Sequence, residues 1–340
     1  MIDNNILIQD KKNNLYIYRL TMDGKSQTGI VGCTSIDDYL NNRIKKHEYT
    51  RKDKEQDRIN HVDICDANTG PIFLTYKYDD KINDIVNIWM KKEVVYDFTA
   101  DDGVRHEVWV IDDDKTIKSI CNLFKNVNSL YIADGHHRAA SAVKVGIKRR
   151  RENPNYSGDE EFNFFLSVLF PHSDLRIIDY NRVVRDLNGL STEEYLFKVS
   201  KKFDVEVYEG KEAYRPFRKG TYGMYLGGRW YKLAVKEGTY NSDDPVDKLD
   251  VSILQDNLLA PILGIDDPRT NDRISFVGGI RGLGELEKMV RQNDMGVAFS
   301  MYPTTLEELM NIADAGKVMP PKSTWFEPKL RSGLFIHKLK

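Results

Sequence analysis

The stretch "LYIADGHHRAASA", residues 130–142, places a carboxylate, two imidazoles and a guanidinium side by side. Four apolar residues precede Asp134, and small and branched residues follow Arg138, so we predict a buried strand, a turn at Gly135 and then a helix. The free N–H groups at the start of a helix bind anions, and an arginine in the first turn adds a bidentate donor. Asp134 could hold a magnesium ion or polarise a hydroxyl. Together these residue types suit phosphate chemistry.

A structural role for the same residues is an equal alternative. Asp134 could merely cap the helix, and Arg138 could form a surface ion pair. A zinc site is disfavoured, because adjacent histidines rarely chelate one ion together and no cysteine or third histidine stands at ligand spacing. Cys33, Cys65 and Cys121 show no CxxC spacing, so we expect buried free thiols and no disulfide framework.

Several blocks of the chain carry a family resemblance. "YIADGHHRAASA", with "IKKHEYTRKDKEQDR", "NTGPIFLTY" and "VMPPKSTWFEPKLRSGLFIHKL", closely resembles the bacterial domain-of-unknown-function family numbered one thousand and fifteen, over essentially the whole chain. Members of that family usually begin with a further N-terminal segment, so we expect this sequence to start inside the family pattern. The Asp-Gly-His-His-Arg element is also similar to that of free-serine kinases, which belong with ParB and sulfiredoxin in one nucleotide-binding superfamily.

The resemblance implies a site and its co-substrates. It implies ATP or ADP, with Mg²⁺ held by Asp134, and a second carboxylate that acts as base toward the serine hydroxyl, for which Glu48 is the candidate. A solvated glutamate before a helix is the alternative for Glu48. The catalytic candidates are Glu48, Asp134 and His137, and the candidates for binding nucleotide or phosphate are Gly135, His136, Arg138, Arg51 and Lys322.

Two functions follow as hypotheses. The first is a small-molecule kinase that transfers a phosphoryl group between ATP or ADP and the hydroxyl of a free amino acid, serine or phosphoserine. The second is a ParB-like nucleotide-dependent binding switch that phosphorylates no metabolite. Sulfinic-acid repair of the sulfiredoxin type is disfavoured, because that reaction needs a cysteine within the motif and none stands there.

The composition is that of a globular protein. Of 340 residues, 41% are hydrophobic and 30% are charged, and the net charge of −2 argues against a nucleic-acid partner. Neither an apolar run long enough to cross a membrane nor a signal-peptide pattern stands in the sequence, so we expect a cytoplasmic protein without a membrane partner, and a homodimer is possible.

The elements that position the site are predicted from local patterns. Asp23-Gly24 and Gly227-Gly228 each predict a hairpin turn, and Thr305 with Glu308 predicts the start of a helix. Alternating strands and helices predict a mixed α/β, or α+β, fold. We divide the chain into a ParB/sulfiredoxin-like nucleotide-binding domain, residues 1–190, and a C-terminal α+β domain, residues 191–340.

Overall fold

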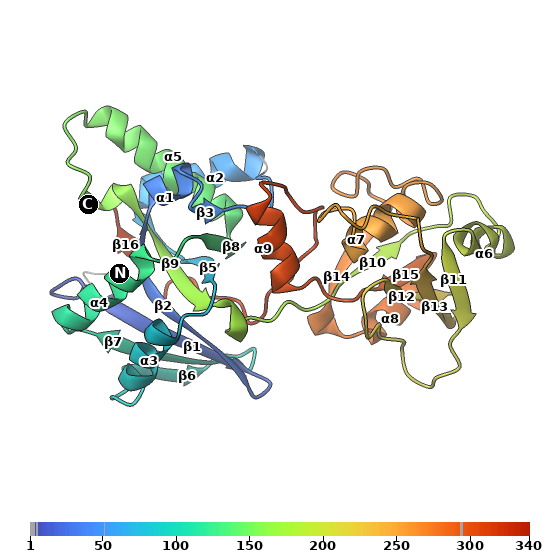
Figure 1. The fold of residues 1–340 in the computed structure, drawn as a ribbon, viewed down its shortest axis with the longest axis horizontal. Coiled ribbons are helices and arrows are strands. Elements are labelled where there is room, and N and C mark those ends of the chain that lie inside the picture. Colours follow the sequence, from blue (N-terminus) through green and yellow to red (C-terminus); the bar gives the residue numbers. More distant parts are fainter. Residues whose placement is uncertain (1–3, 5, 51, 293–294) are drawn as a thin grey trace. The chain divides into compact units, whose positions relative to one another are not determined.

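The computed structural model describes residues 4, 6–50, 52–292 and 295–340 (Figure 1). The chain forms two compact units. The first comprises the residues up to Leu175 together with Pro328–Lys340, and the second comprises Arg176–Glu327.

This division differs from the predicted one in two places. The strand β10 (Tyr180–Val184) precedes the predicted boundary, yet it belongs to the sheet of the second unit, where it lies between β15 and β14. The segment Pro328–Lys340 returns to the first unit, where β16 (His337–Lys338) pairs with β4 (Ala67–Asn68). Both differences arise from pairing between segments far apart in the sequence, which local patterns do not reveal.

The first unit is built on an eight-stranded mixed sheet with the order β3-β8-β5-β9-β2-β1-β7-β6. Its strands are β1 (Leu15–Met22), β2 (Lys25–Ser35), β3 (Ile44–Lys45), β5 (Ile72–Tyr76), β6 (Tyr96–Thr99), β7 (Arg105–Ile111), β8 (Leu130–Asp134) and β9 (Phe164–Pro171). The short strand β8 runs parallel to β3 and antiparallel to β5. The predicted turn between β1 and β2 is confirmed, because Asp23 and Gly24 have φ angles of 52° and 73°.

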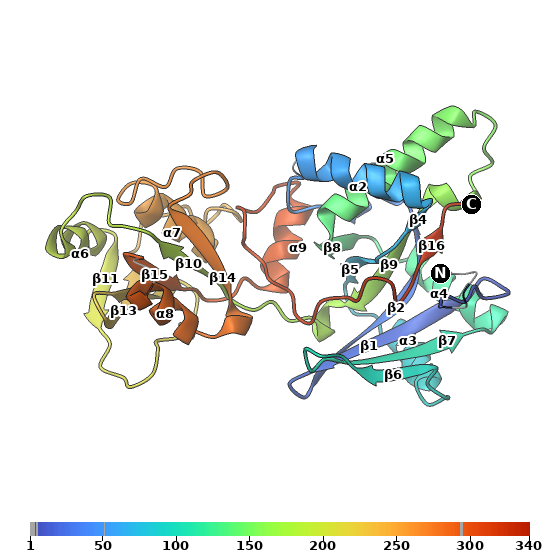
Figure 2. The same ribbon diagram turned by 180° about the vertical axis from the view of Figure 1, so that it is seen from behind.

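The first unit also contains α-helices. They are α1 (Ile36–Leu40), α2 (Lys52–Cys65), α3 (Asp80–Trp89), α4 (Asp114–Lys125) and α5 (His136–Glu152). The helices α2 and α5 pack against each other (Figures 1 and 2). Leu74 and Ile132 from the strands and Ala139 and Val143 from α5 are buried in one core, which fixes the start of α5 against the end of β8.

The second unit has a six-stranded antiparallel sheet with the order β11-β13-β12-β15-β10-β14. Its other elements are β11 (Phe203–Val207), β12 (Thr221–Leu226), β13 (Arg229–Val235), β14 (Ile274–Gly278), β15 (Val297–Ser300), α6 (Thr192–Ser200), α7 (Asp250–Leu254), α8 (Gly284–Gln292) and α9 (Leu306–Asp314). The predicted hairpin at Gly227-Gly228 joins β12 to β13. Thr305 and Glu308 exchange both bonds of a capping box at the start of α9. The mixed α+β class is therefore confirmed.

Two further expectations can be compared with the fold. Within the described residues, no helix is long and apolar enough to span a bilayer. The three cysteines are free thiols, as predicted, but the prediction that they are buried is wrong. Cys65 is the last residue of α2, and Cys121 lies on an exposed face of α4, so neither points into a core.

Candidate functional site

Gly135 joins the strand β8 to the helix α5, as the sequence predicts. It holds the N-cap position of α5 with φ 94°, a left-handed conformation that favours glycine. A Cβ atom at this position would lie 3.0 Å from Nε and 3.1 Å from Nη2 of Arg138. The backbone conformation therefore favours glycine, and the absence of a Cβ leaves room for the folded-back Arg138 side chain.

Asp134 is not the N-cap of α5, so the alternative in which it merely caps the helix is not what the structure shows. Gly135, which has no side chain, is the N-cap, so the first N–H groups of α5 receive no side-chain cap. Oδ1 of Asp134 instead accepts a hydrogen bond from the N–H of Gly135 at 2.9 Å. The first turn of α5 keeps the electrostatic character that favours an anion.

Two cations flank the Asp134 carboxylate. Nζ of Lys329 lies 3.3 Å from Oδ2 and Nη2 of Arg138 lies 3.9 Å from it. The Asp134 side chain is 40% exposed. Partial burial opposes ionisation, but Lys329 and Arg138 outweigh it and hold the pKa of Asp134 below its usual range. The group is thus a carboxylate at neutral pH, with two positive charges beside it.

Arg138 lies between the loop at Gly70 and the start of its own helix. A Cβ atom on Gly70 would lie 3.4 Å from Nη1 of Arg138 and 3.0 Å from Oγ of Ser332. Burial lowers the pKa of Arg138. The positive charge of Arg58 on α2 lowers this pKa further, whereas the negative charge of Asp134 raises it. Because Arg138 and Arg58 repel each other, an anion bound beside them would be electrostatically favourable.

The C-terminal segment contributes Lys329, which the sequence analysis did not single out. Gly333 anchors this segment by donating its N–H to the carbonyl of Thr69 at 2.9 Å, and Nη2 of Arg331 lies 3.0 Å from a carboxylate oxygen of Asp102. The block "VMPPKSTWFEPKLRSGLFIHKL" contains Lys329, so the family resemblance pointed to the segment without selecting the residue.

A pair of buried histidines lies beside this junction. The rings of His47 and His136 meet edge to face with centroids 4.5 Å apart, and the residues are 2% and 5% exposed. Burial lowers the pKa of His136 to about 4 and that of His47 well below its ordinary value. Both imidazoles are therefore neutral at pH 7. Both ring nitrogens of His47 and Nε2 of His136 have no hydrogen-bond partner among the described residues.

Glu48 approaches the same pair from the surface. Its Oε2 lies 3.8 Å from Nδ1 of His136, and its side chain is 48% exposed. This distance exceeds that of a hydrogen bond, so Glu48 contacts a neutral imidazole without being bonded to it. Glu48 lies between β3 and α2, which brings it to the junction of β8 and α5.

The remaining predicted site residues are His137, Arg51 and Lys322. His137 is half-buried, and its carbonyl accepts a hydrogen bond from the hydroxyl of Ser141. Arg51 lies outside the described residues. Lys322 belongs to the second unit, where its Nζ lies 5.8 Å from the ring centroid of Tyr180. The structure thus brings together Glu48, Asp134, Gly135, His136 and Arg138. The catalytic and binding roles of these residues, like those of His137, Arg51 and Lys322, remain predictions.

The junction fits a magnesium ion only in company with phosphates. In the described parts of the chain, no group of three or more histidine, cysteine or acidic residues is arranged to hold a metal. Mg²⁺ bound to nucleotides commonly takes one or two carboxylates and completes its shell with phosphate oxygens and water. Asp134 can supply one such carboxylate.

The fold and the junction define a mixed α+β protein of two units, with a charged strand–helix junction in the first. The sequence matches the family described as "Protein of unknown function (DUF1015)" over residues 1–252, and the chain belongs to this family. No curated protein matches it.

Solved structures of other proteins are similar over most of the chain. A mutant of a free serine kinase in complex with AMP has 12% identity and a TM-score of 0.44, covering 94% of this chain and 90% of that one. A conserved hypothetical protein from Pyrococcus furiosus has 14% identity and a TM-score of 0.43, covering 91% and 95%. SbnI with C-terminal truncation from Staphylococcus aureus has 11% identity and a TM-score of 0.46, covering 91% and 89%. Because these TM-scores lie below 0.5, the argument for function rests on the site residues.

Proposed function

We propose that this protein is a small-molecule kinase that transfers a phosphoryl group between ATP or ADP and the hydroxyl of a free amino acid, serine or phosphoserine. The observation that carries the proposal is the arrangement at the start of α5. Arg138 and Lys329 flank Asp134 there, and the exposed carboxylate of Glu48 lies 3.8 Å from Nδ1 of His136, the first residue of α5. Cations near a helix start would bind phosphate, and a nearby carboxylate would accept the proton of the attacking hydroxyl.

The cationic side would bind the nucleotide phosphates. The N–H groups of α5 and the guanidinium of Arg138 donate to phosphate oxygens, and Lys329 neutralises part of their charge. Bound Mg²⁺, held by Asp134 and phosphate oxygens, would neutralise further charge. Phosphoryl transfer requires little covalent chemistry of the protein, so positioning and charge neutralisation account for most of the rate.

Glu48 would act as the general base. In the direction of serine phosphorylation, its carboxylate takes the proton of the serine hydroxyl while the hydroxyl oxygen bonds to the terminal phosphorus. The bond from that phosphorus to the bridging oxygen breaks, and the nucleotide leaves with one phosphate fewer. Transfer in the reverse direction follows the same steps backward, with Glu48 returning the proton.

The histidine pair beside Glu48 would carry no charge during the reaction. A protonated imidazole 3.8 Å from the carboxylate would oppose transfer of a proton to Glu48. Because burial keeps His47 and His136 uncharged, no positive charge from them opposes proton transfer to Glu48. The pair would also fix the position of the 46–48 segment through packing.

A panel of small molecules tests the proposal. The full chain is incubated with Mg²⁺ and ATP or ADP, together with serine, homoserine, threonine or their phosphate esters, and the products are measured by mass spectrometry. We expect a phosphoryl mass shift on one hydroxy amino acid or its loss from the matching ester. Nucleotide binding without transfer to any of these compounds would contradict the kinase and favour the nucleotide-dependent switch.

A further inference from the structure

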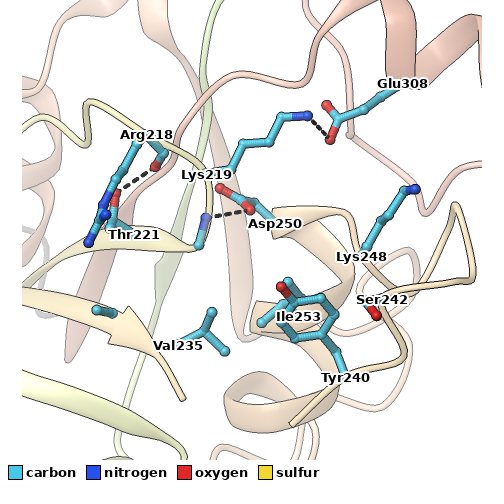
Figure 3. Close-up of a pocket in the computed structure, with 12 residues that line it drawn as sticks. Arg218, Lys219, Thr221, Val235, Tyr240, Ser242, Lys248, Asp250, Ile253 and Glu308 are labelled. Atoms are coloured by element: carbon cyan, nitrogen blue, oxygen red, sulfur yellow. Dashed lines mark hydrogen bonds and ion pairs between the residues drawn. The ribbon is translucent and has the colours of Figure 1, made fainter. Parts of the chain in front are cut away.

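The second unit contains a cavity that lies within that unit alone. Its volume is about 320 Å³, which is at the small end for ligand sites in proteins. Figure 3 shows the residues that line it. Those that the argument uses are Arg218, Lys219, Ser242, Lys248, Asp250 and Glu308.

Asp250 is the buried acid of this cavity. The residue is 9% exposed, and its Oδ1 accepts the N–H of Gly220 at 2.9 Å. Its Oδ2 is buried and has no hydrogen-bond partner among the described residues. Buried carboxylate oxygens are nearly always hydrogen-bonded, so this oxygen offers a place for a donor from a ligand.

Two cations near the cavity lack carboxylate partners. Lys219 is paired with Glu308 at 2.7 Å, so its charge is compensated. Arg218 and Lys248 are exposed, and neither forms an ion pair within the part of the chain that the structure describes. Lys248 lies beside Ser242 on one side of Asp250, and Arg218 lies on the other side (Figure 3).

We propose that this cavity binds a small zwitterion of amino-acid size, with its ammonium group on Oδ2 of Asp250 and its carboxylate beside Lys248. Oδ2 of Asp250 can accept a hydrogen bond from a ligand and Lys248 can pair with an anionic group, and an amino acid supplies both a donor and an anion. Inorganic phosphate carries no positive charge and would be repelled by an ionised Asp250. A diamine would satisfy Asp250 but leave Lys248 facing another cation.

This site and the proposed kinase site consist of different residues, so the two proposals can fail independently. The kinase residues Glu48, Asp134 and Arg138 belong to the first unit, whereas every residue that lines the cavity belongs to the second. An Arg138→Ala variant should therefore retain zwitterion binding in the cavity, and a protein without kinase activity could still bind an amino acid there.

Ligand binding should depend on pH through Asp250. Burial is the main reason that the pKa of this carboxyl is raised to about 7. The charge of Glu308 raises the pKa as well, whereas the hydrogen bond from Gly220 and the charge of Lys219 lower it. The charged and titratable groups that line the cavity or act on Asp250 are Arg218, Lys219, Tyr222, Tyr240, Lys248 and Glu308. An ammonium ligand favours the ionised form, so its affinity should increase as the pH rises from 6 to 8.

Calorimetric titration of the full chain with the protein L-amino acids, inorganic phosphate and putrescine tests this proposal. At least one amino acid should bind, with affinity at least tenfold lower in Asp250→Asn and severalfold lower in Lys248→Ala. The exposed Lys288 on α8 is not among the residues that line the cavity, and Lys288→Ala should bind like the wild type. Thermal unfolding verifies that Asp250→Asn is folded, and the exposed Lys248 provides a variant with little risk to the fold. The proposal is overturned if no amino acid binds, if binding is equal in both cavity variants and the wild type, or if phosphate or putrescine alone shows the Asp250-dependent binding.

Discussion

The ammonium group of Lys329 lies 3.3 Å from Oδ2 of Asp134, although 195 residues separate the two in the sequence. The C-terminal segment thereby places a cation at the junction of β8 and α5. Arg138 and Lys329 both lie beside the Asp134 carboxylate, so a phosphate group at the start of α5 would meet charges from the middle of the sequence and from its C-terminal segment.

Replacing Lys329 with alanine should weaken nucleotide binding. Both side chains of the ion pair are more than a third exposed, so we expect a loss of about fivefold, equivalent to about 1 kcal/mol. Titration of ADP into wild type and Lys329→Ala measures the effect. Lys338→Ala, an exposed lysine in the same segment, is the matched control and should bind as the wild type does. Equal affinities in all three proteins would remove Lys329 from the site.

Arg138→Ala should weaken ADP and ATP binding more than Lys329→Ala does. Loss of a charged hydrogen bond costs about 1.5–3 kcal/mol, because the guanidinium donates directly to phosphate. The nucleotide titration that tests Lys329 measures this variant as well. An unchanged dissociation constant would show that Arg138 does not contact the nucleotide.

Gly135→Ala should impair nucleotide binding beyond its effect on stability. The left-handed φ costs about 1–3 kcal/mol for alanine, and the added Cβ would meet the Arg138 guanidinium at 3.0 Å. Gly24→Ala is the control, since Gly24 also has a positive φ but open space around its Cβ position. We expect both variants to be destabilised in chemical unfolding, and only Gly135→Ala to lose ADP affinity. Comparable affinity loss in both would mean that general strain, rather than displacement of Arg138, is responsible.

The histidine pair should make the first unit sensitive to acid. The pKa of His136 is about 4 in the folded protein and about 6.5 when exposed, so the unfolded chain binds the extra proton between these values. Stability is therefore lost as the pH falls from about 6.5 to 4, with a slope of up to about 1.4 kcal/mol per pH unit for His136.

Urea unfolding of His136→Asn across this pH range measures the contribution of His136. The slope should be shallower than in the wild type by up to that amount. His61→Asn, which changes an exposed histidine on α2, should retain the wild-type slope. A wild-type slope in His136→Asn would show that the buried imidazole does not titrate in this way.

Local patterns predicted the strand, turn and helix around Gly135, because the apolar run of β8 and the glycine lie within a few residues of each other. The capping box of Thr305 and Glu308 was predictable for the same reason. The contact of Lys329 with Asp134 was not, since no local pattern links residues so far apart. The burial of His47 could not be predicted from the sequence either. The polar segment around it has no apolar periodicity, and its packing partner His136 lies far along the chain.

The central claim is that Glu48 removes the proton from a hydroxyl that attacks phosphate bound at the start of α5. Single-turnover transfer between nucleotide and the amino acid found in the panel, compared in wild type and Glu48→Gln, tests it most directly. We predict a rate lower by about 10²–10⁴-fold in the variant, with the affinity for nucleotide nearly unchanged. Turnover close to that of the wild type in Glu48→Gln would contradict the account.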